Sequence, residues 1–261
     1  MSDPKRADVC AVAIAEAFRG DGERLCNPIG NLPLVGGRLA AATFEPHLAI
    51  TDGYYTLLDN VPPVGLPEEE RVAQRVIGQW NPYREMFGLL WRGKRHVMMG
   101  ATQVDRHGNQ NIAAIGDWRA PRAQLLGFRG APGNTINHTT SYWVPNHSPK
   151  VVVESVDVVC GIGYDRAAEL GPVASRFHEV RRVVTNLCVF DFDATDPAGL
   201  RTLRLRSVHP WTTVEEVLAA TGCDVVVPDD VGVSRGPDAA EAAELGRLDP
   251  QGLRFAEVPD E

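Results

Sequence analysis

Short runs of apolar and β-branched residues alternate with segments of helical periodicity along this 261-residue chain. The predicted strands span residues 25–29, 47–51, 96–100, 123–126, 151–153 and 156–160, and the predicted helices span residues 7–18, 38–43 and 83–91. Proline, glycine and acidic residues between positions 60 and 74 predict an exposed loop. Regular alternation of this kind is typical of strands that lie parallel and are connected by helices. We therefore expect an α/β fold with a mainly parallel sheet flanked by helices.

The last third of the chain adds a hairpin and a capped helix. Residues 182–190 and 203–208 have strand character, and the acidic segment 191–196 between them predicts the turn of a β-hairpin. Thr212 and Glu215 have capping-box spacing for a helix that ends at Ala220. We expect a single domain over residues 1–245, followed by a C-terminal tail over residues 246–261.

Composition restricts the class of protein. The net charge of −8 disfavours nucleic-acid binding, which normally needs a basic face. The five cysteines are widely spaced among apolar residues and lack zinc-site spacing, which indicates buried thiols in a reducing compartment and no metal. No segment approaches the roughly twenty apolar residues of a membrane span. We expect a cytoplasmic protein that binds neither nucleic acid nor membranes.

Residues 99–138 concentrate glycine, asparagine and charge between two apolar runs. Gly127, Gly130 and Gly133 recur at three-residue spacing, and glycine lets main-chain N–H groups approach an anion without interference from a Cβ atom. After a buried strand, the loop 130–134 could present such donors to a developing oxyanion. The alternative is an ordinary surface loop. The amides and the imidazole that could add contacts are those of Gln103, Asn109, Asn134, Asn137 and His138.

Two of these residues have structural alternatives. Asn109 ends the polar run 105–109, which is typical of a hairpin turn because Gly108 supplies the required flexibility. A single histidine such as His138 packs in a core or on a surface as readily as it faces a cleft. The residues alone leave both alternatives open.

A carboxylate follows the predicted strand 47–51. Asp52 stands at a strand end, where open α/β sheets bind ligands, but an aspartate before Gly53 is also a good turn. The sequence has no G-x-S-x-G elbow, no P-loop and no G-x-G-x-x-G pattern. Serine-triad hydrolysis, nucleotide hydrolysis and hydride transfer are therefore disfavoured.

Several of these motifs together resemble the B subunits of family I coenzyme A transferases. The motifs are Gly100-Ala101, Gln103-Val104-Asp105-Arg106, Gly108-Asn109, the segment 127–134, and His209-Pro210 with the helix 212–222. The resemblance covers residues 7–222. It implies a CoA-transferase-like α/β fold, a CoA thioester as substrate, and an A subunit as partner, often in an A2B2 heterotetramer with the active site at the subunit interface. It implies no cofactor beyond the coenzyme A of the substrate.

The chain departs from the transferase pattern at one position. In family members a glutamate at a strand end attacks the thioester and forms an acyl anhydride, whereas this strand ends in Ile50-Thr51-Asp52-Gly53. Threonine cannot form the anhydride, and aspartate is one methylene shorter, which displaces the nucleophile.

A second set of motifs is similar to the steroid ring-cleaving hydrolases of the same superfamily. These motifs span residues 51–53, 133–138, 141–144, 154–159 and 161–165. The similarity implies hydrolytic retro-Claisen cleavage of a carbon–carbon bond in the last rings of a steroid CoA ester, with the general base on the A subunit. A transferase that uses Asp52 as its nucleophile is the alternative. The candidate catalytic residues are Asp52, Asn134 and His138, and the candidate substrate-binding residues are Gly53, Gln103, Asn109, Gly130, Gly133 and Asn137.

Overall fold

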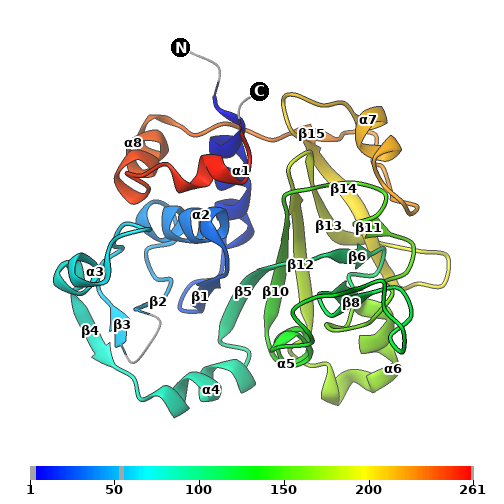
Figure 1. The fold of residues 1–261 in the computed structure, drawn as a ribbon, viewed down its shortest axis with the longest axis horizontal. Coiled ribbons are helices and arrows are strands. Elements are labelled where there is room, and N and C mark those ends of the chain that lie inside the picture. The colour runs from blue at the N-terminus through cyan, green and yellow to red at the C-terminus, as the bar shows by residue number, and fades with distance from the viewer. Residues whose placement is uncertain (1–3, 53–55, 260–261) are drawn as a thin grey trace. The chain divides into compact units, whose positions relative to one another are not determined.

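The computed structural model describes residues 4–52 and 56–259 and divides the chain into two compact units. The first unit combines Met1–Met98 with Arg235–Glu261, and the second comprises Met99–Ser234. Figure 1 shows the elements of both units. The expected single domain over residues 1–245 stays a prediction, and each unit is described by itself below.

The first unit is built on α1 and α2, which pack against each other. Its helices are α1 (Arg6–Ala17), α2 (Asn31–Ala42), α3 (Glu68–Gln74), α4 (Tyr83–Trp91), α8 (Ala239–Leu248) and the 3-10 helix η1 (Leu253–Ala256). Its strands are β1 (Leu25–Pro28), β2 (Ile50–Thr51), β3 (Thr56–Leu58), β4 (Ile77–Trp80) and the start of β5 (Arg95–Gly100). Strands β1 and β5 are parallel, and β2, β3 and β4 form a small antiparallel sheet.

The second unit contains most of the strands. They are β6 (Gln103–Asp105), β7 (Gln110–Asn111), β8 (Ala114–Ile115), β9 (Ala123–Gln124), β10 (Thr139–Val144), β11 (Val152–Val153), β12 (Glu179–Thr185), β13 (Cys188–Thr195), β14 (Arg201–Val208) and β15 (Gly232–Val233). Strands β10 and β12 are parallel, β12, β13 and β14 are antiparallel, and β14 and β15 are parallel. The helices are α5 (Ala131–Asn137), α6 (Tyr164–Ala174) and α7 (Val214–Ala219).

The expected α/β class is confirmed, with a mixed rather than uniformly parallel sheet. The predicted helices over residues 7–18 and 83–91 and the predicted strands over residues 25–29 and 96–100 are present as α1, α4, β1 and β5. The predicted hairpin is present as β13 and β14, but the strand predicted over residues 182–190 is divided between β12 and β13 by a bend at residues 186–187. The acidic segment 191–196 lies mostly within β13. The hairpin turn follows at residues 196–200.

Several predicted elements differ from the structure. The helix predicted over residues 38–43 begins earlier, at Asn31, and its Gly36 packs so closely on α1 that a Cβ would overlap Ile14. The predicted loop over residues 60–74 contains α3, whose three first-turn glutamates suit a helix N-terminus. Residues 156–160 do not form the predicted strand. The capping box uses Thr213 and Glu216, one residue later than predicted.

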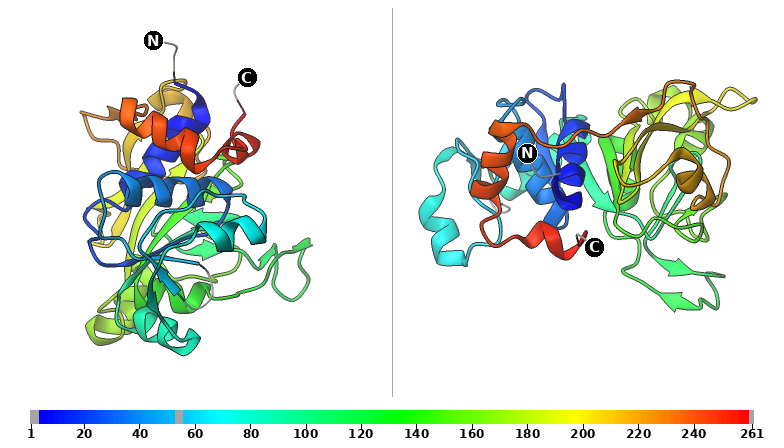
Figure 2. Two further views of the ribbon diagram at one scale, coloured as in Figure 1. Left: turned by 90° about the vertical axis from the view of Figure 1, so that its left-hand side faces the viewer. Right: turned by 90° about the horizontal axis from the view of Figure 1, so that it is seen from above.

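The segment around residues 123–134 also differs from its prediction. Residues 123–126 were expected as a buried strand, whereas β9 is exposed and pairs with β8 in a hairpin that extends away from the other strands of its unit (Figure 2). The predicted loop 130–134 forms the start of α5, with Gly130 as its N-cap. Helix α5 leads into β10, so it lies at the amino end of that strand.

Candidate functional site

Asp52 directly follows β2 in the first unit, as predicted. The Asp52 Oδ1 atom accepts a hydrogen bond of 3.2 Å from the main-chain N–H of Thr56, which begins β3. The Oδ2 atom lies 2.7 Å from the Arg75 guanidinium, and the Asp52 side chain is only 2% exposed. Arg71 donates to the main-chain oxygen of Asp52 at 3.0 Å. The carboxylate and the backbone of Asp52 are therefore each held by an arginine.

A cavity of about 160 Å³ adjoins Asp52. Residues of β1, α2 and β2 line it, and Asn27, Thr51 and Asp52 supply polar groups. The main chains of β1 and β2 run parallel through a bridge between Leu25 and Ala49, so the cavity lies where both strands end. This is the edge at which α/β sheets bind ligands. Gly53, predicted to bind substrate, lies outside the described residues.

Arg38 gives the cavity a partly buried cation. Its guanidinium donates to the main-chain oxygens of Pro62 and Pro63, which anchors α2 to the loop between β3 and α3. Burial lowers the pKa of this guanidinium from its usual value. The residues that line the cavity therefore include both a cation and the ion-paired Asp52.

The predicted glycine segment of the second unit opens α5. Gly127 has a φ of +81°, which few residues other than glycine adopt. A Cβ atom on Gly133 would have only the Asn137 amide within contact range, at 3.9 Å, so this face of the helix is open. Gly130 and Gly133 are exposed. They lie on one short helix, and their role in substrate binding stays a prediction.

The other candidate side chains of α5 make contacts within the second unit. The Asn134 amide lies 3.5 Å from the Met99 Sδ atom, and Asn137 donates to the Gly133 oxygen at 2.8 Å. His138 is fully buried, with its Nδ1 atom 3.1 Å from the Thr139 oxygen. Of the alternatives for His138, the structure therefore favours burial, and its catalytic role, like that of Asn134, stays a prediction.

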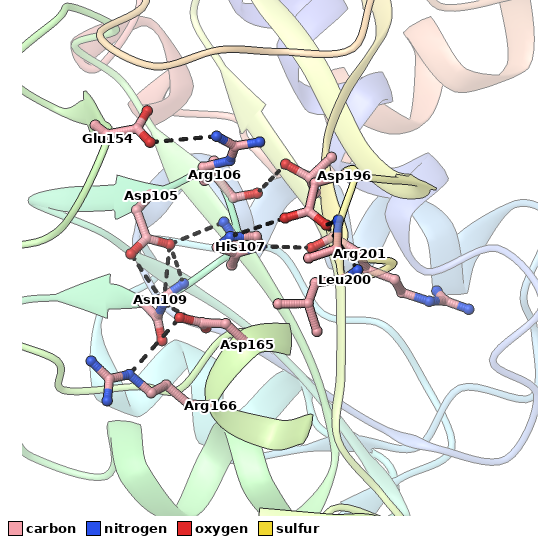
Figure 3. Close-up of polar contacts among 12 residues, drawn as sticks. Asp105, Arg106, His107, Asn109, Glu154, Asp165, Arg166, Asp196, Leu200 and Arg201 are labelled. Carbon is pink, nitrogen blue, oxygen red and sulfur yellow. Dashed lines mark hydrogen bonds and ion pairs between the residues drawn. The ribbon is translucent and has the colours of Figure 1, made fainter. Parts of the chain in front are cut away.

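Gln103 and Asn109 lie on the hairpin formed by β6 and β7. The Gln103 amide accepts from Asn111 and donates to Asp157 at 3.2 Å. The Asn109 side chain is buried, and its Nδ2 atom lies 3.0 Å from the Asp105 carboxylate and 2.9 Å from that of Asp165 (Figure 3). Both amides support the hairpin in this structure, so a ligand would have to compete with these hydrogen bonds.

Residues 105–109 form the hairpin turn between β6 and β7, which is the structural one of the two interpretations given for Asn109. The Asp105 carboxylate accepts from the main-chain N–H groups of His107 and Asn109 (Figure 3). Burial raises the pKa of Asp105, while the hydrogen bonds from Asn109 act in the opposite direction. The main chain of Gly163 lies so close to the main chain of this turn that a Cβ on Gly163 would overlap the His107 oxygen. Helix α6 is thereby fastened to the hairpin.

Sequence reasoning did not identify Arg71 and Arg75. They lie 19 and 23 residues from Asp52, in a segment predicted to be an exposed loop. Their four-residue spacing was the available signal, because it places both side chains on one helix face.

The described residues were compared with what a metal site or a membrane-spanning helix requires. Within residues 4–52 and 56–259, no group of three or more histidine, cysteine, aspartate or glutamate side chains could hold a metal ion. None of the helices in this part of the chain is long and apolar enough to cross a membrane. The five cysteines are free, and four of them are buried.

The chain is similar in sequence to several known proteins. No family model matches it. It is 45% identical over 259 residues to the cholesterol ring-cleaving hydrolase IpdB subunit of Rhodococcus jostii, covering 99% of this chain and 98% of that protein. The same subunit of Mycobacterium tuberculosis is 46% identical over 254 residues, with coverage of 97% and 98%. The B subunit of the 3-oxoadipate CoA-transferase of Pseudomonas knackmussii is 26% identical, with 91% of each chain covered.

Solved structures agree with these relatives. A chain of the Rhodococcus jostii IpdAB crystal structure matches with a TM-score of 0.88 and 44% identity, covering 98% of this chain and 99% of that one. Glutaconate coenzyme A-transferase from Acidaminococcus fermentans matches with a TM-score of 0.80 at 22% identity, with coverage of 97% and 98%, which shows the fold alone. The fold is therefore that of the CoA-transferase-like α/β proteins. Within this class, the chain belongs to the family of cholesterol ring-cleaving hydrolase IpdB subunits.

Proposed function

We propose that this chain is the B subunit of a heteromeric hydrolase that cleaves a carbon–carbon bond in the last rings of a cholesterol-derived CoA ester. The observation that carries this proposal is the 45% identity, from end to end, with a subunit of that activity. The partner is the A subunit of the same enzyme, and we infer an A2B2 heterotetramer. We further infer that the enzyme works in the cytoplasm without a cofactor beyond the coenzyme A of its substrate.

The proposed reaction is a hydrolytic retro-Claisen step. Water adds to a ring ketone, the bond from that carbon to its neighbour breaks, and the electron pair moves to the neighbouring carbon as a stabilised enolate. A proton then completes the ring-opened product, and the former ketone becomes a carboxylate. This chemistry needs a base for the water and donors for the developing oxyanion. We assign the base to the A subunit, and the candidate donors of this chain are the N–H groups of Gly130 and Gly133 and the amide of Asn134.

The environment of Asp52 supports hydrolysis over acyl transfer. A transferase needs a carboxylate that is free to attack the thioester carbon. Both Asp52 oxygens accept hydrogen bonds, one from the Thr56 main chain and one from Arg75. A paired carboxylate of this kind is poorly oriented for attack, so the transferase is the weaker candidate.

The test is a reconstitution in isotopically labelled water. The chain is produced together with its A subunit and incubated with a CoA ester that retains the last two steroid rings, and the CoA products are analysed by mass. The proposal predicts a ring-opened CoA ester with one solvent oxygen in a new carboxylate. Transfer of CoA to a free carboxylic acid, with no ring opening, would contradict it.

A further inference from the structure

The end of β2 is held by two arginines of one helix. Arg71 lies within α3 and Arg75 is its C-cap residue, so their four-residue spacing brings both side chains to one face. Arg71 donates to the main-chain oxygen of Asp52, and Arg75 pairs with its carboxylate at 2.7 Å. We call Arg71 and Arg75 the arginine clamp.

The clamp acts on a residue that is also fixed from the opposite strand. The main-chain N–H of Asp52 donates to the Thr56 oxygen at 3.2 Å, while the Thr56 N–H donates to Asp52 Oδ1. The carboxylate thus has one oxygen bound to the backbone and the other to a guanidinium. Its orientation is set from two sides.

Asp52 lies beside a cavity, although its paired side chain is only 2% exposed. Asp52 lines the cavity of about 160 Å³ at the ends of β1 and β2, together with Asn27 and Thr51. A carboxylate beside a cavity at this edge could reach a bound thioester if its Oδ2 atom were released. The ion pair with Arg75 therefore affects whether the Asp52 carboxylate, in addition to water, is available as a nucleophile.

We propose that Arg75 is a positioning residue that determines reaction specificity by keeping Asp52 from acting as a nucleophile. This inference rests on the proposed hydrolase function. In the reaction that the clamp prevents, Asp52 Oδ2 bonds to the thioester carbon, the carbon–sulfur bond breaks, and coenzyme A leaves as a thiolate that takes a proton from water. The product is an acyl anhydride on Asp52, which hydroxylamine converts to a hydroxamate.

The experiment compares complexes of the A subunit with four forms of this chain. These are the unchanged chain, Arg75→Gln, the double variant Arg75→Gln with Asp52→Asn, and the control Arg84→Gln. The Arg84 side chain is 87% exposed, so its replacement removes the same charge from the same unit without disturbing a buried ion pair. Each complex is incubated with oxocyclohexane-carboxyl-CoA, a small cyclic β-oxoacyl thioester, and then with hydroxylamine. The mass of the peptide containing Asp52 is measured, together with release of coenzyme A.

We expect Arg75→Gln to give about tenfold more hydroxamate on Asp52 than the unchanged chain, because the nucleophile regains its freedom to align. The double variant and Arg84→Gln are expected to give no increase. Equal, background amounts in Arg75→Gln and the unchanged complex would overturn the inference while leaving the hydrolase intact. Abundant hydroxamate in the unchanged complex would instead overturn the proposed function, since Asp52 would then already be a nucleophile.

A second variant guards against loss of assembly. Arg75→Lys keeps a cation beside the buried carboxylate but loses the planar guanidinium, so the complex has a weaker ion pair without an uncompensated charge. We expect hydroxamate between the amounts of the unchanged chain and Arg75→Gln. If Arg75→Gln fails to assemble, a background amount in an assembled Arg75→Lys complex overturns the inference.

Discussion

At the scale of single residues, buried polar side chains of the second unit form hydrogen bonds that hold its own turns and helices together. Asn109 illustrates this, because its amide donates to Asp105 and Asp165 while its oxygen accepts from the Gly163 N–H at 2.7 Å. A buried carboxylate that loses such donors is left with unsatisfied hydrogen-bond acceptors, which is destabilising. The stability of the hairpin formed by β6 and β7 therefore depends on Asn109.

Replacement of this amide provides the first prediction. Asn109→Ala is expected to lower the free energy of unfolding by about 1–3 kcal/mol, since Asp105 and the Gly163 N–H lose their partner. Urea denaturation measures the change. Asn137→Ala is the matched control, because Asn137 has a hydrogen bond within its own helix, and a change within about 0.5 kcal/mol is expected. Equal losses in both variants would contradict this view of Asn109.

The sequence located some site residues and could not locate their partners. The end of the strand before Asp52 could be predicted from neighbouring residues, because an apolar run followed by Asp-Gly indicates where a strand stops. The ion pair with Arg75 depends on how α3 folds back toward β2, and no local pattern encodes that contact. For the same reason, the many amide contacts of Gln103 and Asn109 were not predictable from the residues alone.

At the scale of elements, the glycine-rich segment forms a helix where a loop was expected. Helix α5 has only seven residues, too few to be stable in isolation, so contacts with its unit hold it. The Thr135 hydroxyl accepts from the Ile162 N–H at 2.9 Å, and the His178 Nδ1 atom lies 2.6 Å from the Thr135 oxygen. The glycine, proline and asparagines of α5 have low helix propensity, and the tethers that hold the helix join segments distant in the chain, so the sequence did not predict it.

Two glycines of this region predict opposite outcomes for the same substitution. Gly133→Ala is expected to leave stability unchanged or raise it by up to about 1 kcal/mol, because the site is open and alanine favours helix. Gly163→Ala is expected to lower it by about 1–3 kcal/mol, because the new methyl overlaps the His107 backbone. Thermal unfolding compares the two variants. If Gly133 contacts substrate, Gly133→Ala also raises KM in the assembled enzyme, and an unchanged KM would count against that role.

Two buried histidines link the ends of several strands in the second unit. The His147 ring nitrogens lie 3.0 Å from the hydroxyls of Thr185 and Thr221, and His209 Nε2 lies 2.8 Å from the Thr185 oxygen. Burial lowers the pKa of His147 to about 4 and that of His209 also to about 4. Both imidazoles are therefore neutral in the folded protein at neutral pH.

These histidines predict a loss of stability in acid. Because the ordinary pKa is 6.5 and the folded value is about 4, the unfolded chain binds more protons between those two values. The stabilisation is present above pH 6.5 and falls toward pH 4, by up to about 3 kcal/mol for each imidazole. Urea denaturation across this range measures the slope. His147→Gln is expected to reduce the slope, and an unchanged slope would show that other groups are responsible.

At the scale of the whole molecule, the two ends of the chain belong to one unit. Arg254 of η1 pairs with Asp8 of α1 at 2.7 Å and with Asp249 at 2.9 Å. Residues 246–259, expected as a tail, therefore include buried parts of the first unit. The alternation of strands and helices was enough to predict the α/β class, but contacts between residues 246 positions apart leave no local signature.

The ion pairs of Arg254 give the last prediction. Arg254 is buried, and its removal leaves the fully buried Asp249 side chain without its cation, which typically costs about 3–5 kcal/mol. Arg254→Gln is therefore expected to lower the free energy of unfolding strongly, as measured by urea denaturation. Arg247→Gln is the matched control, because its pair with Glu244 is half-exposed and contributes less than about 1 kcal/mol. If both substitutions have the same small effect, the C-terminal segment is dispensable for the first unit. A large difference would mean that truncations beginning after α8 unfold the unit that carries Asp52.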